Sequence, residues 1–93
     1  MEPLQRVTAQ TVDVLAMMLE SQGPIWGLQI VKELERPSGT IYPILDRLER
    51  QGWIRSSWEE HTDTQRRRRR VYEFTPEGKA AARKTCAEFS AGH

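Results

Sequence analysis

The chain has 93 residues with 14 Lys or Arg and 13 Asp or Glu, so its formal net charge is only +1. This length predicts a single domain that buries roughly 60 to 70% of its unfolded surface, which is enough for a small core without staples. One cysteine and two histidines exclude an internal disulfide and a spaced zinc cluster, and no run is apolar enough for a signal peptide or membrane span, so we expect a cytoplasmic chain without a cofactor.

The first predicted element is a helix over residues 8–21, preceded by a loose arm over residues 1–7. Thr8 is a suitable N-cap, apolar residues recur at helical spacing, and a Gly-Pro pair follows the helix as a stop signal. Met17 and Met18 extend the apolar surface to more than one side. This surplus either packs against a second subunit or lies on other helices of the same chain, and the sequence leaves both possibilities open.

A second helix is predicted over residues 25–35, as the scaffold helix of a pair. Its apolar side chains recur every three residues, at Ile25, Leu28, Val31 and Leu34. Gly27 has no Cβ, so we expect another helix to approach closely there. Pro37 disfavours α geometry at the residue before it and therefore ends the helix.

The stretch 38–52 is predicted to form one helix with two different faces. Its apolar residues follow the i, i+3, i+4, i+7 spacing, at Ile41, Ile44, Leu45 and Leu48. The other face carries small, aromatic and cationic groups that suit contact with DNA: Ser38, Gly39, Thr40, Tyr42, Pro43, Arg47 and Arg50. Either Ser38 or Thr40 caps the helix. Two helices joined by about three residues have helix-turn-helix geometry.

A β-hairpin is predicted after Gly52, where the pattern changes to alternation over residues 53–58. A polar segment leads to a return strand over residues 68–74, with Tyr72 and Phe74 toward the core. The predicted tip of the hairpin and the start of the return strand carry five arginines: Arg66, Arg67, Arg68, Arg69 and Arg70. Such a run is usually a solvated face. Beside a helix-turn-helix, however, we expect it to grip DNA phosphates or the minor groove, as guanidinium groups suit both.

The charge distribution agrees with this assignment of the DNA-facing half. Residues 1–35 carry two Lys or Arg against five Asp or Glu, giving −3, whereas residues 36–93 carry twelve against eight, giving +4. The basic excess therefore lies in the half that contains the helix of residues 38–52 and the hairpin.

The last predicted helix spans residues 75–89. It opens with Thr75 as a cap, a proline at the first helical position and an acid near the positive end of the helix dipole. One stripe of this helix holds Ala82, Cys86 and Phe89. We expect the helix to form part of a dimer interface; the alternative is that it folds back on the first helix. Residues 90–93 are expected to fray.

Four segments carry a family resemblance: residues 23–30, 38–54, 58–59 and 69–78. The Gly-Thr-Ile-Tyr-Pro and Tyr-Glu-Phe-Thr-Pro-Glu-Gly runs among them make the chain resemble the PadR-type transcriptional regulators over about residues 12–82. The resemblance implies a homodimeric winged-helix repressor that binds a palindromic operator. The chain departs from many members in its short link between the two helices, and from some in its short C-terminal helix. The sequence does not specify which small-molecule effector, if any, the protein binds.

We therefore expect an α+β, mostly α, winged helix-turn-helix domain with three helices, a β-hairpin wing and a C-terminal helix. Its expected partner is double-stranded DNA, bound as a homodimer through the first and last helices, without catalysis. One alternative is a winged helix that docks on a protein instead of DNA. An enzyme with Cys86 as nucleophile and His61 as base is disfavoured, since a lone cysteine on such a helix is usually a small hydrophobe. Trp26 and Trp58 either line a ligand pocket or pack.

Overall fold

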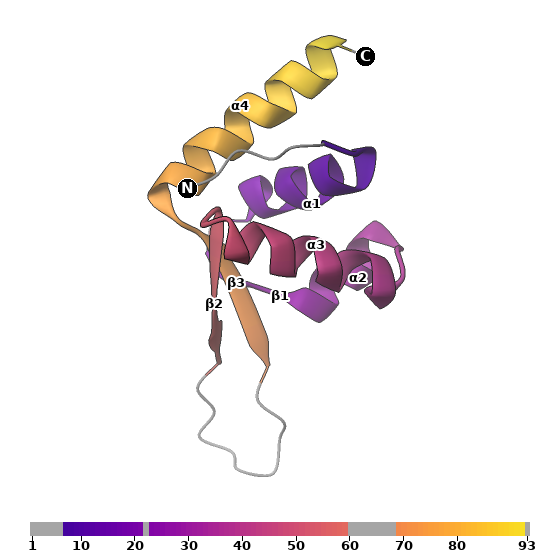
Figure 1. Ribbon diagram of the computed structural model, residues 1–93. Coiled ribbons are helices and arrows are strands. Elements are labelled where there is room, and N and C mark those ends of the chain that lie inside the picture. Colours follow the sequence, from indigo (N-terminus) through magenta and orange to yellow (C-terminus); the bar gives the residue numbers. More distant parts are fainter. Residues whose placement is uncertain (1–6, 22, 60–68, 93) are drawn as a thin grey trace.

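The computed structural model describes residues 7–21, 23–59 and 69–92 (Figure 1). Over these residues the elements are α1 (Ala9–Glu20), β1 (Ile25–Trp26), α2 (Gly27–Leu34), α3 (Ser38–Arg50), β2 (Ile54–Trp58), β3 (Arg70–Phe74) and α4 (Pro76–Gly92). The helix pair α2–α3 and the β2–β3 hairpin confirm the mostly helical winged helix-turn-helix fold. No helix in the described ranges combines the length and the apolar character needed to cross a membrane.

Helix α1 forms as predicted, with Thr8 as its N-cap. The Thr8 hydroxyl oxygen accepts a hydrogen bond from the Thr11 amide at 3.2 Å, which satisfies one of the amides left open at a helix start. Met17 and Met18 are buried in the core of the same chain. The surplus apolar surface of this helix is therefore covered within one subunit. Residues 1–6 of the expected loose arm lie outside the described residues.

The predicted apolar stripe of α2 is wrong in two places. Ile25 and Trp26 form strand β1, and Leu28 is 53% exposed, whereas Ile30 is fully buried. Steps of three residues drift by about 60° each around a helix of 3.6 residues per turn, so such a stripe cannot stay on one face. The close approach expected at Gly27 is confirmed: a Cβ there would lie 2.9 Å from the Tyr42 ring of α3.

The turn between α2 and α3 is closed by Glu35, which adopts the left-handed conformation with φ 53° and ψ 38°. Its amide donates to the Lys32 carbonyl and the Arg36 amide donates to the Val31 carbonyl, a pairing that satisfies the last carbonyls of α2. The Arg36 guanidinium also donates to Asp13 of α1 at 2.6 Å. The turn is thus fixed against the body of the domain.

Neither of the two expected residues caps α3. The helix already begins at Ser38 with Pro37 in the N-cap position, and no side chain makes a capping hydrogen bond there. The amides of Thr40 and Ile41 donate to the Pro37 carbonyl at 2.9 and 3.1 Å. Pro43 consequently lies inside the helix, where it has no N–H to donate to the carbonyl four residues before it.

The three strands form one antiparallel sheet in the order β1-β3-β2. Strand β2 pairs with β3 in a register that sets Ile54 opposite Phe74 and Ser56 opposite Tyr72. Tyr72 is 2% exposed and Phe74 packs against the core, so the predicted core side of the return strand is confirmed. The short strand β1 was not predicted, and it covers the other edge of β3.

Helix α4 starts as predicted: the Thr75 hydroxyl accepts from the Gly78 amide at 3.0 Å and lies 2.8 Å from the Gly52 carbonyl, to which it donates. The helix continues to Gly92, beyond the predicted end at Phe89, and His93 lies outside the described residues. The fraying expected over residues 90–93 stays a prediction. Helix α4 packs along α1, with Ala82 fully buried. The fold-back alternative therefore holds within one chain.

Candidate nucleic-acid interface

Helix α3 separates an apolar face from a polar one, as its sequence pattern predicts. Ile41, Leu45 and Leu48 are at most 1% exposed and anchor the helix on the core. On the remaining surface Ser38, Gly39, Pro43, Arg47 and Arg50 are exposed, and Thr40 is half-buried. Within the described ranges, no residue forms a hydrogen bond or ion pair with the side chains of Arg47 or Arg50. Both guanidinium groups are available to an external partner.

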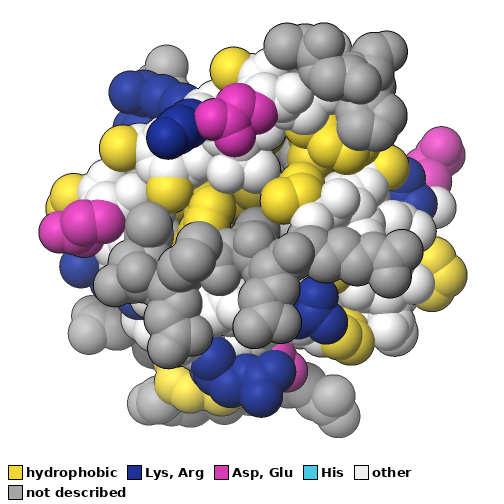
Figure 2. All heavy atoms as spheres, turned by 45° about the horizontal axis from the view of Figure 1, so that its top comes forward, with side chains coloured by type: hydrophobic (Ala, Val, Ile, Leu, Met, Phe, Trp, Pro, Cys, Tyr) yellow, Lys and Arg dark blue, Asp and Glu magenta, His cyan; other side chains and the backbone are white. Residues whose placement is uncertain are grey.

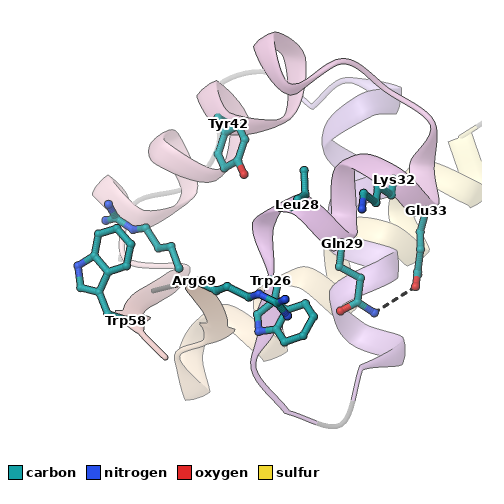
Figure 3. A pocket seen from close by; sticks show the side chains of 9 residues that line it. Trp26, Leu28, Gln29, Lys32, Glu33, Tyr42, Trp58 and Arg69 are labelled. Atoms are coloured by element: carbon teal, nitrogen blue, oxygen red, sulfur yellow. Dashed lines mark hydrogen bonds between the residues drawn. The ribbon is translucent and has the colours of Figure 1, made fainter. Parts of the chain in front are cut away.

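Tyr42 is half-buried, as Thr40 is, and its ring faces α2. It lies over Gly27 and borders a groove of about 820 Å³ between α2, α3 and the wing (Figure 3). The groove is lined by Trp26, Leu28, Gln29, Lys32, Glu33, Tyr42, Trp58, Arg69 and Arg70. Its polar rim includes a hydrogen bond of 3.1 Å from Gln29 to Glu33.

Two tryptophans whose role the sequence left open lie at this groove. Trp26, half-buried, and Trp58, 56% exposed, both line it. The sequence did not predict that α2 forms one side of this groove, because the apolar pattern at every third residue assigned the exposed Leu28 to the core. A strict 3.6-residue period centred on Ile30 is the signal that would have turned Leu28 outward.

The arginine tract is divided between residues that contact the protein and residues outside the described ranges. Arg66, Arg67 and Arg68 are in the second group. The Arg69 guanidinium lies 3.9 Å from the centroid of the Trp26 ring, which is a cation–π contact. Figure 3 shows the two side chains next to each other. Arg70 forms a salt bridge of 3.3 Å with Glu49 of α3. At least these two arginines contribute to the protein's own structure.

The alternative of a cysteine nucleophile gains no support from the surroundings of Cys86. The residue is half-buried on α4, and burial raises the pKa of its thiol, which lowers the fraction of reactive thiolate at neutral pH. Its suggested base, His61, lies outside the described residues. In the part of the chain that the structure describes, no three His, Cys, Asp or Glu side chains gather as metal ligands.

Residues 14–84, well over half of the chain, match the model of a family described as "Transcriptional regulator PadR-like family". No curated protein sequence matches the chain. Among solved structures, smu.1704 from Streptococcus mutans UA159 is 26% identical with a TM-score of 0.72, over 96% of this chain and 85% of that one.

A PadR-like transcription factor from Bacteroides fragilis is 26% identical with a TM-score of 0.65, over 86% of this chain and 81% of that one. MepR, a transcription regulator of the Staphylococcus aureus multidrug efflux pump MepA, is 23% identical with a TM-score of 0.71, over 91% of this chain and 59% of that one. The likeness to MepR concerns the fold alone.

Proposed function

The chain belongs to the PadR-like family of transcriptional regulators, and on this premise we propose that it is a sequence-specific repressor that binds a palindromic operator as a homodimer. The observation that supports DNA binding most is the exposed polar face of α3 beside the wing. In this proposal Ser38, Gly39, Thr40, Tyr42, Pro43, Arg47 and Arg50 face the major groove. The arginine tract reaches the neighbouring backbone or minor groove.

Selection of bound sites from a random DNA pool tests the proposal. A two-fold symmetric dimer presents two copies of α3, so we expect enrichment of an inverted repeat whose half-sites lie about one helical turn apart. Enrichment of a single half-site would retain DNA binding and reject the dimer. If no sequence is enriched at low salt, the protein is not a sequence-specific DNA-binding protein.

The proposal assigns different roles to Arg47 and Tyr42. Arg47 is exposed and can offer two parallel donors to a guanine edge, a pairing that discriminates between bases by about 1 to 3 kcal/mol. Arg47→Ala should therefore relax the preference at one position of each half-site. Tyr42 has one hydroxyl, which suits a phosphate, so Tyr42→Phe should lower affinity with little change of preference. Affinities for an operator set with every single base change measure both effects.

Arg83→Ala is the matched control for Arg47→Ala, because it removes the same charge from an exposed position on α4. It should change neither affinity nor base preference appreciably. If Arg47→Ala weakens all sequences uniformly while Tyr42→Phe changes the preferred base, the two roles are reversed. If folded variants of both bind as the original protein does, α3 does not enter the groove.

The three arginines outside the described residues should contribute charge to DNA binding without distinguishing between sequences. Replacing Arg66, Arg67 and Arg68 together by alanine is expected to weaken binding to all DNA about equally. The slope of log affinity against log salt concentration should fall by about one for each phosphate that the variant no longer neutralises. Fluorescence anisotropy at several salt concentrations measures both. If the variant has the same salt slope as the original protein, the tract is a solvated loop. If the DNA affinity of the original protein depends only weakly on salt, the result favours docking on a protein instead.

A further inference from the structure

A chain of hydrogen bonds ties the wing to α3. The carboxylate of Glu49, in the last turn of α3, accepts from both the amide and the hydroxyl of Ser56 in β2, the amide at 3.1 Å. Its other oxygen accepts from Arg70 of β3 at 3.3 Å. Arg70 also donates to the Ser56 hydroxyl, from two nitrogens at 2.8 and 3.1 Å. Three elements thus meet in one polar cluster, Glu49–Ser56–Arg70.

We propose that Arg70 is a positioning residue, which fixes the wing relative to α3 through Glu49 and Ser56, rather than a residue that contacts DNA. The proposal rests on the proposed DNA-binding function. It separates Arg70 from the rest of the arginine tract, which was assigned to the DNA interface as a whole.

The geometry of Arg70 supports this role. Its guanidinium is already turned toward a carboxylate and a hydroxyl of the same protein, and it lies 5.8 and 5.9 Å from the ring centroids of Trp58 and Tyr72. The side chains of Arg70 and Glu49 are 45% and 30% exposed, so the pair is only partly screened by solvent. A phosphate contact would have to compete with these interactions.

The position of the cluster explains why the wing needs it. Strand β2 leaves α3 through a short turn and pairs only with β3, whereas β3 also pairs with β1 at Tyr72 and Val71. Among the described strands, β2 is therefore an edge strand that the sheet holds on one side only. Ser56 lies in the middle of β2, so the contact with Glu49 holds the hairpin at a point beyond its base. The wing and α3 can then reach adjacent grooves of the DNA while their positions relative to each other stay fixed.

Glu49→Gln tests the proposal through the sign of its effect. Removing a negative charge beside a DNA-binding surface ordinarily strengthens binding to a polyanion. Glutamine has one acceptor oxygen in place of the two carboxylate oxygens, so its amide cannot accept from Ser56 on one side and from Arg70 on the other. We therefore expect the affinity for operator DNA to fall about tenfold, a typical size for coupling through a packed network.

Glu73→Gln is the matched control. Glu73 is also on the wing, but it pairs across the hairpin with exposed Arg55 at 3.0 Å and does not reach α3. Loss of such an exposed pair should change the affinity by no more than about twofold. If Glu49→Gln binds DNA as well as Glu73→Gln does, or more tightly, the positioning role is wrong.

Arg70→Lys separates charge from geometry, since lysine keeps the charge and lacks the planar fork. A positioning role predicts that Arg70→Lys loses about as much affinity for operator DNA as Glu49→Gln does. The double variant Glu49→Gln, Arg70→Lys should bind DNA no more weakly than either single variant, because both substitutions break the same cluster. A phosphate contact by Arg70 predicts instead that Arg70→Lys retains most of the affinity and that the two effects add. Either of these results would overturn the proposal.

Amide hydrogen exchange gives a readout without DNA. The Ser56 amide is held by Glu49, so Glu49→Ala, which removes both carboxylate oxygens, should accelerate its exchange about tenfold, and Glu73→Ala should leave it unchanged. An unchanged Ser56 rate would reject the cluster whether or not the protein binds DNA. Accelerated exchange in a protein that binds no DNA would reject the proposed function, and with it the role of Arg70 in DNA binding, while leaving the cluster intact.

Discussion

Gly78→Ala is expected to destabilise the domain by at least about 3 kcal/mol, at the upper end of the usual cost of overpacking. A Cβ on Gly78 would lie 1.8 Å from the carbonyl oxygen of Trp53 and 2.5 Å from its carbonyl carbon. These are backbone atoms, so no side-chain rotation relieves the clash. In a domain of this size the midpoint of thermal unfolding should fall by roughly 15 °C or more. Urea denaturation followed by circular dichroism measures the free energy directly.

Two other glycines provide graded controls. Nothing lies within 4 Å of a Cβ at Gly39, so Gly39→Ala should be neutral or should stabilise α3 by up to about 1 kcal/mol. At Gly27 the obstacles are the rings of Tyr42 and Tyr72, and the half-buried Tyr42 can move, so an intermediate loss is expected. If Gly78→Ala is as stable as Gly39→Ala, the first turn of α4 does not pack against the Trp53 backbone, in the turn between α3 and β2.

The Thr-Pro-Glu-Gly run shows which part of a motif a sequence explains. Local rules predicted that Thr75 caps a helix and that a proline follows it, and the structure confirms both. The requirement for Gly78 comes from the Trp53 backbone, which is distant in the sequence, and Thr75 itself donates to the Gly52 carbonyl. A local sequence pattern cannot predict contacts between residues that are far apart in the sequence.

The same distinction accounts for the missed strand and the misassigned leucine. Ile25 and Trp26 form a strand because they pair with Tyr72 and Val71 of β3, a partner more than forty positions along the chain. Two residues are too few to show the alternation of a strand, so both were assigned to the helix predicted over residues 25–35. The wing and α3 were predictable because each is long enough to show its period.

The arginine tract marks the limit of composition as a guide to site residues. Five identical residues in a row gave one prediction for all of them, yet Arg69 lies over Trp26 and Arg70 meets Glu49 and Ser56. Charge alone predicts attraction to phosphate. The partner of each guanidinium depends on the fold around it, which brings α3 and both strands of the wing together.

Removing residues 85–93 is expected to convert the proposed homodimer into monomers and to lower operator affinity by about a hundredfold or more, because the second half-site is no longer bound at high effective concentration. In Figure 1 the C-terminal half of α4 runs away from the body of the molecule. Figure 2, with this end turned forward, shows hydrophobic side chains at the surface near the middle of the face. Light scattering and operator titration measure the two effects.

The truncation leaves Ala82, which is buried against the core, in place, so α4 should still pack on α1 within each chain. A thermal melt of the truncated protein verifies this. The double variant Lys84→Ala, Glu88→Ala is the matched control: it removes an exposed pair 4.0 Å apart on α4, whose contribution to stability is small, and should remain dimeric. A folded truncated protein that is still a dimer would place the interface elsewhere. Monomers that bind the full operator as tightly as before would show that dimerisation is not the source of affinity.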